Sequence, residues 1–163
     1  MTITLSSIPA SLDEMKAMPE AAFDTPYKTA ALYFAAICNY HSDKDLCIEM
    51  LNFIRGPQEP LSQMQQLFIR DRMSDKADYI GKSYFMGATP QNNYTPAIPY
   101  TLNFVDNPYS FSQEGYALLY VANGGSDNPR PVKLRQKGSQ WFLWDYAGTL
   151  AGIRIPAAQD LWA

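Results

Sequence analysis

Residues 130–144 read RPVKLRQKGSQWFLW, and this stretch decides the fold. The runs on either side of Lys137-Gly138 alternate apolar and polar residues with a period of two, which places alternate side chains on one face of a strand. Gly138 can adopt the positive φ that a tight turn between antiparallel strands needs. The stretch therefore predicts a β-hairpin.

A two-residue loop at Lys137-Gly138 gives three pairs across the hairpin: Gln136 with Ser139, Leu134 with Trp141, and Val132 with Leu143. A three-residue loop is the alternative, and it changes these pairs. With the shorter loop, the face expected in the core carries Val132, Leu134, Trp141 and Leu143. The opposite face carries Lys133, Arg135, Gln140, Phe142 and Trp144.

Composition bounds the class of protein. The 163 residues suit one domain, residues 1–163, and 47% hydrophobic with 18% charged residues is typical of a folded chain. A net charge of −3 argues against nucleic acid as the partner. The charge is uneven, because residues 1–125 carry eight Lys/Arg and thirteen Asp/Glu whereas residues 126–163 carry five and three.

The expected location is the cytoplasm. Residues 1–18 lack the basic segment and long apolar run of a secretory signal, and no stretch reaches the roughly twenty apolar residues of a membrane span. Two cysteines do not form a disulfide framework. We therefore expect no membrane partner.

The N-terminal half reads as helices, over residues 25–75, after a loose arm at residues 1–10. Thr25 can cap a helix whose first residue is Pro26, and the apolar run that follows predicts a central buried helix. A second helix follows the polar residues 42–45 and ends at Gly56-Pro57. A third begins at Pro60, with an inner stripe of Leu61, Met64, Leu67 and Phe68.

The C-terminal half reads as strands, over residues 100–146. Alternating patterns occur at residues 101–105 and 116–122, and the hairpin follows them. Helices first and strands afterwards indicate an α+β fold, in which an N-terminal helical layer packs on a C-terminal antiparallel sheet of three to five strands.

Several motifs resemble those of a family of uncharacterised bacterial proteins. They are GATPQNNYTP at residues 87–96, RP at 130–131, LRQKG at 134–138, QWFLW at 140–144 and GIR at 152–154, and the similarity includes residues 52–57. The resemblance implies a bacterial, intracellular domain of unknown function. The family has no assigned catalytic residues, so the resemblance implies none here.

Catalytic and metal-ligating groups are sparse. Cys38, His41 and Cys47 offer a thiolate nucleophile or soft metal ligands, but their spacing matches no usual zinc site and a fourth ligand is missing. The structural alternative is apolar packing of both cysteines, with His41 at a helix C-terminus. The paired carboxylates, Asp13-Glu14 and Asp43/Asp45, fit helix caps better than hydrolysis. We expect no metal and no cofactor.

Two surfaces are candidates for binding. The irregular segment 87–100 presents Asn92, Asn93 and Tyr94, although prolines and asparagines also suit an ordered structural cover. The hairpin presents Lys133, Arg135, Phe142 and Trp144, with Arg130 at its mouth and Asp127 as a possible partner of Arg130. These groups suit an anionic or acidic partner, whereas the structural alternative is that basic stems cover aromatic rings. An edge position would also allow a partner strand to add to the sheet.

The leading hypothesis is a non-enzymatic binding or interaction module whose partner is a protein or peptide. The alternatives are a hydrolase that uses Cys38 and His41 or paired carboxylates, and a domain that binds a small ligand between helices and sheet. Thiol reactivity distinguishes the cysteine enzyme from the binding module.

Overall fold

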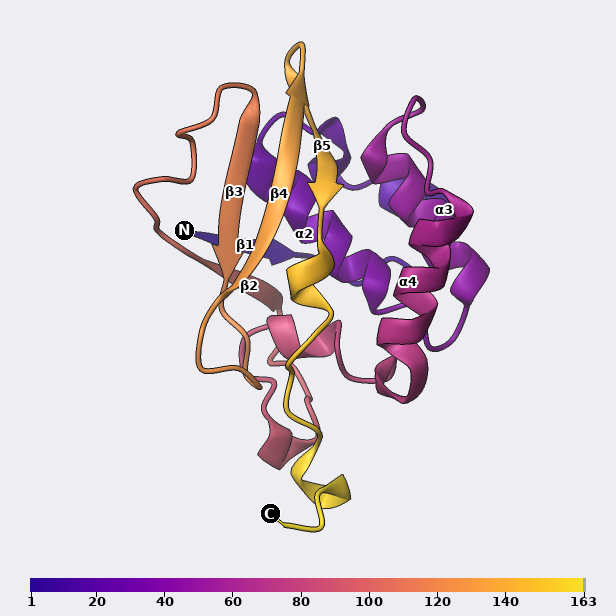
Figure 1. Ribbon diagram of the computed structural model, residues 1–163, viewed down its shortest axis with the longest axis vertical. Coiled ribbons are helices and arrows are strands. Elements are labelled where there is room, and N and C mark those ends of the chain that lie inside the picture. The colour runs from indigo at the N-terminus through magenta and orange to yellow at the C-terminus, as the bar shows by residue number, and fades with distance from the viewer. Residues whose placement is uncertain (163) are drawn as a thin grey trace.

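Helix α2 (Pro26–Ile37) lies at the centre of the computed structural model, which describes residues 1–162 (Figure 1). The Thr25 side chain accepts a hydrogen bond from the Lys28 backbone N–H at 3.2 Å, and Pro26 takes the first position, where no backbone donor is needed. Every residue from Thr29 to Ile37 is buried, which confirms the predicted central helix.

Three further α-helices belong to the N-terminal half of the described chain: α1 (Leu12–Lys16), α3 (Lys44–Arg55) and α4 (Gln63–Met73). Asp43 caps α3 by accepting a hydrogen bond from the Leu46 backbone N–H at 3.0 Å, and α3 ends at Gly56, whose φ is +91°. No helix within residues 1–162 has the length and apolar character needed to cross a membrane.

Helix α4 begins later than its predicted start at Pro60. Ser62 and Gln65 form a capping box, in which the Gln65 backbone N–H donates to Ser62 Oγ at 3.1 Å and the Ser62 N–H donates to Gln65 Oε1 at 2.9 Å. These reciprocal bonds satisfy two donors that would otherwise have no partner, so the helix begins after Ser62.

The predicted inner stripe of α4 is wrong in part. Met64 is 80% exposed and Leu67 is 40% exposed, whereas Ile69 and Met73 are buried. The helix reaches the core through its C-terminal turns, so its first apolar residues face solvent.

The sheet is antiparallel throughout, as expected, and contains β1 (Thr2–Leu5), β2 (Tyr100–Val105), β3 (Tyr116–Val121), β4 (Arg130–Lys137) and β5 (Gln140–Asp145). The strands lie in the order of their numbers. Helix α2 passes behind β3, β4 and β5 in Figure 1, and no helix lies in front of them. This arrangement is the predicted α+β fold with one covered face.

The core lies between α2 and the sheet. Its strand residues lie at alternate positions along β2 to β5 and at the end of β1: Leu5, Leu102, Phe104, Ala117, Leu119, Val121, Val132, Leu134 and Leu143. Tyr33 of α2 bonds to the segment that follows the last strand, because its hydroxyl lies 2.6 Å from the hydroxyl of Thr149. The hydroxyl of Tyr84 donates to the carbonyl of Thr149 at 2.5 Å. The segment after β5 is therefore fastened to the core by buried hydrogen bonds.

The N-terminal arm is not loose, contrary to expectation. Residues 2–5 form β1, in which Ile3 lies opposite Leu102, and the backbone N–H of Phe104 donates to the carbonyl of Met1 at 2.8 Å. The side chain of Leu5 is fully buried. β1 pairs with residues 100–103 of β2, whereas β3 pairs with Phe104 and Val105, so each part of β2 has a strand partner.

The hairpin forms, but its loop is Gly138-Ser139 rather than Lys137-Gly138. The observed pairs are Lys137 with Gln140, Gln136 with Trp141, Arg135 with Phe142, and Leu134 with Leu143. Gly138 has a φ of +63° and Ser139 has no positive φ, as a type II′ turn requires. From Leu134 to Lys137 each residue's partner moves by two positions, so these side chains keep their predicted face. A register shift between Lys133 and Leu134 places Asp145 opposite Lys133.

Short 3₁₀ turns join these elements: η1 (Pro19–Ala22), η2 (Ser74–Lys76), η3 (Lys82–Tyr84), η4 (Pro90–Asn92), η5 (Ala147–Thr149) and η6 (Ala157–Gln159).

Replacing Leu5 tests whether β1 belongs to the folded core. We expect Leu5→Ala to lower the free energy of unfolding by about 3 kcal/mol, because it leaves a cavity at a fully buried position. Urea denaturation would show a lower midpoint with an unchanged slope. Thr2→Ala is the matched control on the same strand, where the side chain is exposed. A Leu5→Ala midpoint equal to that of the wild type would mean that the arm is not packed.

Candidate functional site

The predicted site residues fall into two separate regions. The segment 87–99 lies at the lower end of the molecule in Figure 1, near the C-terminal segment, whereas the β4–β5 turn lies at the upper end. Asn92, Asn93 and Tyr94 are therefore distant from the end of the hairpin that carries Arg135 and Phe142.

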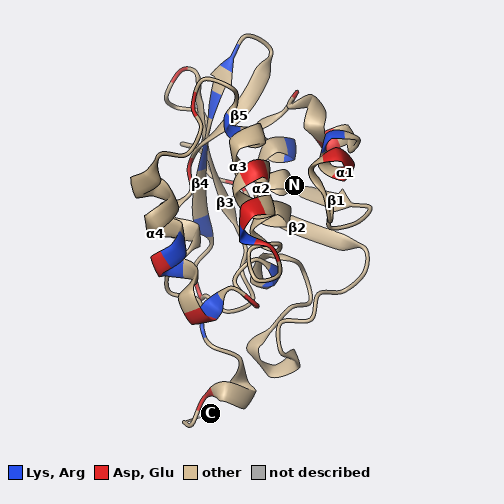
Figure 2. Ribbon diagram, turned by 90° about the vertical axis from the view of Figure 1, so that its right-hand side faces the viewer, with Lys and Arg blue, Asp and Glu red and all other residues tan. Residues whose placement is uncertain are grey.

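The hairpin residues contribute to a surface that we call the outer face, defined as Tyr116, Leu118, Tyr120, Lys133, Arg135 and Trp144. Tyr116 lies directly opposite Arg135, and Leu118 opposite Lys133, so these side chains share the side of the sheet away from α2. All six are half-buried. The basic positions along β4 are blue in Figure 2.

Cations and aromatic rings alternate across the outer face. The guanidinium carbon of Arg135 lies 4.0 Å from the ring centroid of Trp144, and Lys133 Nζ lies 4.7 Å from that of Tyr116. The rings of Tyr116 and Trp144 meet edge to face, with centroids 6.3 Å apart. Stacking of this kind orders long basic side chains and leaves their N–H groups available at the ring edges.

A cleft of about 540 Å³ adjoins the outer face, between the turn that follows α3 and the β4–β5 end of the sheet. Arg135 belongs to both surfaces, and the ring of Phe142 lines the cleft. Gly56 lies against that ring, because a Cβ atom built on Gly56 would come within 3.2 Å of Phe142 Cδ1. Glu59 Oε1 lies 3.7 Å from Arg135 Nη2.

β5 is the edge strand of the sheet, the position that would allow a partner strand to add, but its edge is partly occupied. The backbone N–H of Trp141 donates to the carbonyl of Phe23 at 2.8 Å, and Arg55 Nη1 donates to the carbonyl of Trp144 at 3.2 Å. These two bonds obstruct the addition of a partner strand along β5.

Asn92 uses its side chain within the loop. Its Oδ1 accepts hydrogen bonds from the backbone N–H groups of Thr89 and Thr95, at 2.9 and 3.0 Å, and its Nδ2 donates to the carbonyls of Gly87 and Thr95, at 2.7 and 3.2 Å. The amide is saturated by the backbone, which matches the structural interpretation of this segment.

Tyr94 also holds the loop in place. It is fully buried, stacks on Tyr79 with ring centroids 5.2 Å apart, and donates its hydroxyl to the carbonyl of Arg154. Burial raises the pKa of Tyr94 to about 12, so the phenol is neutral at physiological pH. Asn93 is exposed, with a φ of +57°, and borders a pocket of about 380 Å³.

Arg130 binds backbone and side-chain oxygens near its own strand. Its Nε donates to Ser126 Oγ at 3.1 Å, and its Nη2 donates to the carbonyl of Gly152 at 2.9 Å. Asp127, which we considered as a partner of Arg130, pairs with Arg154 at 2.8 Å instead. Arg130 therefore fastens the C-terminal segment to the start of β4.

A family model, described as Domain of unknown function (DUF6935), matches residues 7–157. The chain belongs to this family. No curated protein and no solved structure that was compared with the chain is similar to it. The prediction of a family without an assigned function is confirmed.

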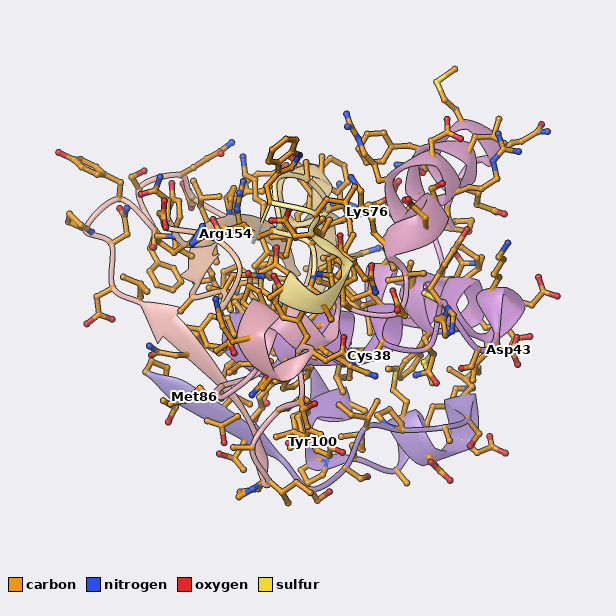
Figure 3. The ribbon with its side chains drawn as sticks, turned by 90° about the horizontal axis from the view of Figure 1, so that it is seen from below. Cys38, Asp43, Lys76, Met86, Tyr100 and Arg154 are labelled. Atoms are coloured by element: carbon orange, nitrogen blue, oxygen red, sulfur yellow. The ribbon has the colours of Figure 1, made fainter. Side chains whose placement is uncertain are left out.

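The cysteines of this DUF6935 domain are poorly suited to nucleophilic catalysis. Burial raises the pKa of Cys38 to about 12 and also raises the pKa of Cys47, so both remain thiols at neutral pH. In Figure 3 Cys38 lies near the middle of the molecule, whereas Asp43 lies at its edge. Residues 1–162 contain no group of three or more His, Cys, Asp or Glu side chains that could hold a metal ion.

The paired carboxylates act at helix ends. Asp43 caps α3, and Glu14 accepts a hydrogen bond from the Ala10 backbone N–H at 2.7 Å beside the Ser11 cap of α1. Neither pair of carboxylates lines either of the two pockets described above.

Sequence reasoning missed Arg55, Glu59 and Tyr116. Arg55 is the last residue of α3 and Glu59 follows the helix, so both read as surface charges, and only the fold brings them to the hairpin. Tyr116 could have been found, because strand alternation places it on the same face as Leu118 and Tyr120.

Tyr94→Phe tests the structural role of the loop. Removing the hydroxyl leaves the Arg154 carbonyl without its donor, so we expect a loss of about 1 kcal/mol in the free energy of unfolding. Chemical denaturation measures this loss. Tyr109→Phe is the control, since Tyr109 is 73% exposed, and it should be neutral. Equal stability of both variants would contradict the role of Tyr94.

Thiol labelling tests the cysteines. At pH 8 the folded protein should react with iodoacetamide far more slowly than the protein in urea, because the raised pKa keeps Cys38 protonated. Mass spectrometry of peptides separates Cys38 from Cys47. Rapid modification of Cys38 in the folded state would restore the cysteine-enzyme hypothesis.

Proposed function

We propose that this domain is a non-enzymatic binding module of the bacterial cytoplasm, and that it receives a segment of a protein or peptide on the outer face. The observation that supports the proposal is the alternation of Lys133, Tyr116, Trp144 and Arg135 on the side of the sheet that α2 leaves uncovered. Folding alone does not require aromatic rings at these positions.

The outer face offers two kinds of contact. Rings and the Leu118 side chain provide apolar area for a partner, and tyrosine and tryptophan supply such area with little loss of side-chain freedom. Lys133 and Arg135 provide N–H donors that the stacking holds in place. A partner that combines aromatic or apolar residues with acidic ones fits both contacts.

Nucleic acid is a poorer match. One face of the Tyr116 ring and one face of the Trp144 ring carry a cation of the same chain, which leaves less ring surface on which a base could stack. The net charge of −3 also opposes the approach of a phosphate backbone.

A blocked decapeptide of alternating tyrosine and glutamate tests the proposal. We expect saturable binding by isothermal titration calorimetry, with a change in tryptophan fluorescence as Trp144 becomes covered. Trp144→Leu should weaken binding roughly tenfold, because it removes both the ring and the support of Arg135.

Arg72→Gln is the matched control. Arg72 stacks on Phe68 at 5.1 Å, in α4, and makes no contact with the outer face. It should leave the affinity unchanged, whereas Arg135→Gln should reduce it. If the wild type binds neither this peptide nor its tyrosine–glutamine counterpart, the proposal is overturned.

A further inference from the structure

Arg55 is a buried cation without an anion. The residue is only 5% exposed. It is the last residue of α3 and lines the cleft. Nε donates to the carbonyl of Glu59 at 2.8 Å, and Nη1 donates to the carbonyl of Trp144 at 3.2 Å. Within residues 1–162, Nη2 makes no hydrogen bond and no carboxylate lies within 4.0 Å of the guanidinium. Tyr79 Oη is the only fully buried side-chain nitrogen or oxygen without a partner in residues 1–162, so Nη2 of Arg55 keeps contact with solvent in the cleft and is accessible to a ligand there.

The rest of the cleft adds to this positive charge. Arg135 and Lys137 line the same cavity, and Lys137 donates a hydrogen bond to the neutral Gln58. Glu59 is the single acidic residue among the lining residues. Its Oε1 lies 3.7 Å from Arg135 Nη2, beyond hydrogen-bond distance, so this partly exposed ion pair contributes little. Three cations thus face one carboxylate in a protein whose net charge is −3.

We infer that this cleft binds the side-chain carboxylate of an aspartate or glutamate in the bound peptide. The inference rests on the proposed function, because Arg135 joins the cleft to the outer face, where the rest of the peptide would lie. The carboxylate would meet the free Nη2 of Arg55, and its methylene groups would pack on the ring of Phe142. Glu59 favours a singly charged carboxylate over a phosphate dianion, because its own charge repels the dianion more strongly.

An internal side chain suits the cleft better than a chain terminus. The cavity of about 540 Å³ opens beside a surface that can hold a continuous peptide, so a side chain can enter it while the backbone crosses the outer face. With Nε and Nη1 engaged, Arg55 offers one nitrogen, Nη2, to one oxygen of the carboxylate.

Two blocked decapeptides, one alternating tyrosine with glutamate and one alternating tyrosine with glutamine, test the inference by calorimetry at constant ionic strength. We expect the glutamate peptide to bind roughly tenfold more tightly, which corresponds to one hydrogen bond between charged groups. Equal affinities would overturn the carboxylate site while leaving the binding module intact. Absence of binding by both peptides would overturn both proposals.

Variants of the cleft residues test which side chains cause the preference for the glutamate peptide. Arg55→Gln should reduce the preference for glutamate to less than threefold, and Arg72→Gln should preserve it. If Arg55→Gln fails to fold, Lys137→Gln decides instead, because Lys137 is exposed and its loss should still reduce the preference severalfold. A preference that survives Lys137→Gln together with Arg135→Gln would contradict the inference.

Two further probes separate the sources of negative charge. A tyrosine–glutamine peptide with a free C-terminus should bind no better than its amide, and tighter binding would overturn the choice of a side chain. Sodium acetate should compete with the glutamate peptide at least as well as sodium phosphate at equal ionic strength. Stronger competition by phosphate would mean that the cleft prefers a phosphoryl group to a carboxylate, and it would overturn the inference.

Discussion

The structure depends on the enclosure of α2. From Thr29 to Ile37 the helix has no exposed residue, so it is stable only if other elements cover every side of it. The sheet covers one side, and α3 and η1 cover others. Tyr84 of η3 packs on Phe34, and Thr149 of η5 bonds to Tyr33. The Thr29 hydroxyl in this run donates to the carbonyl of Trp141 at 2.7 Å and so connects the helix to the edge strand. Burial of a single helix thereby determines which face of the sheet is used for folding.

The opposite face has a different physical basis. It has no helix to cover it, and its rings are shielded by the stems of Lys133 and Arg135. The cations over the rings limit contact between apolar surface and water, and their charged groups stay at the surface. The same groups remain available to another molecule. Shielding and recognition are therefore compatible on one surface, and the guanidinium of Arg55 lies in the cleft that adjoins that surface.

Local patterns were sufficient to predict much of the fold. Thr25 and Pro26 marked the start of α2, Asp43 marked that of α3, and Gly138 marked the hairpin, because each acts within a few residues. The errors arose where distant contacts decide. β1 is four residues long and forms only because β2 lies beside it. Arg55 meets Trp144 across 89 residues of chain, which no local pattern reveals. The candidate site was predicted only on its hairpin side for the same reason.

The buried hydrogen bonds of Thr149 bear on where the domain can be cut. β5 ends at Asp145, yet two phenols of the core, Tyr33 and Tyr84, find their partners after it, at Thr149. Tyr94 reaches further still, to the carbonyl of Arg154. A recombinant fragment that stops with the sheet would expose three tyrosine hydroxyls to an apolar interior without acceptors. Fusion partners and affinity tags therefore belong beyond Arg154, where the chain has completed its internal bonds to the core.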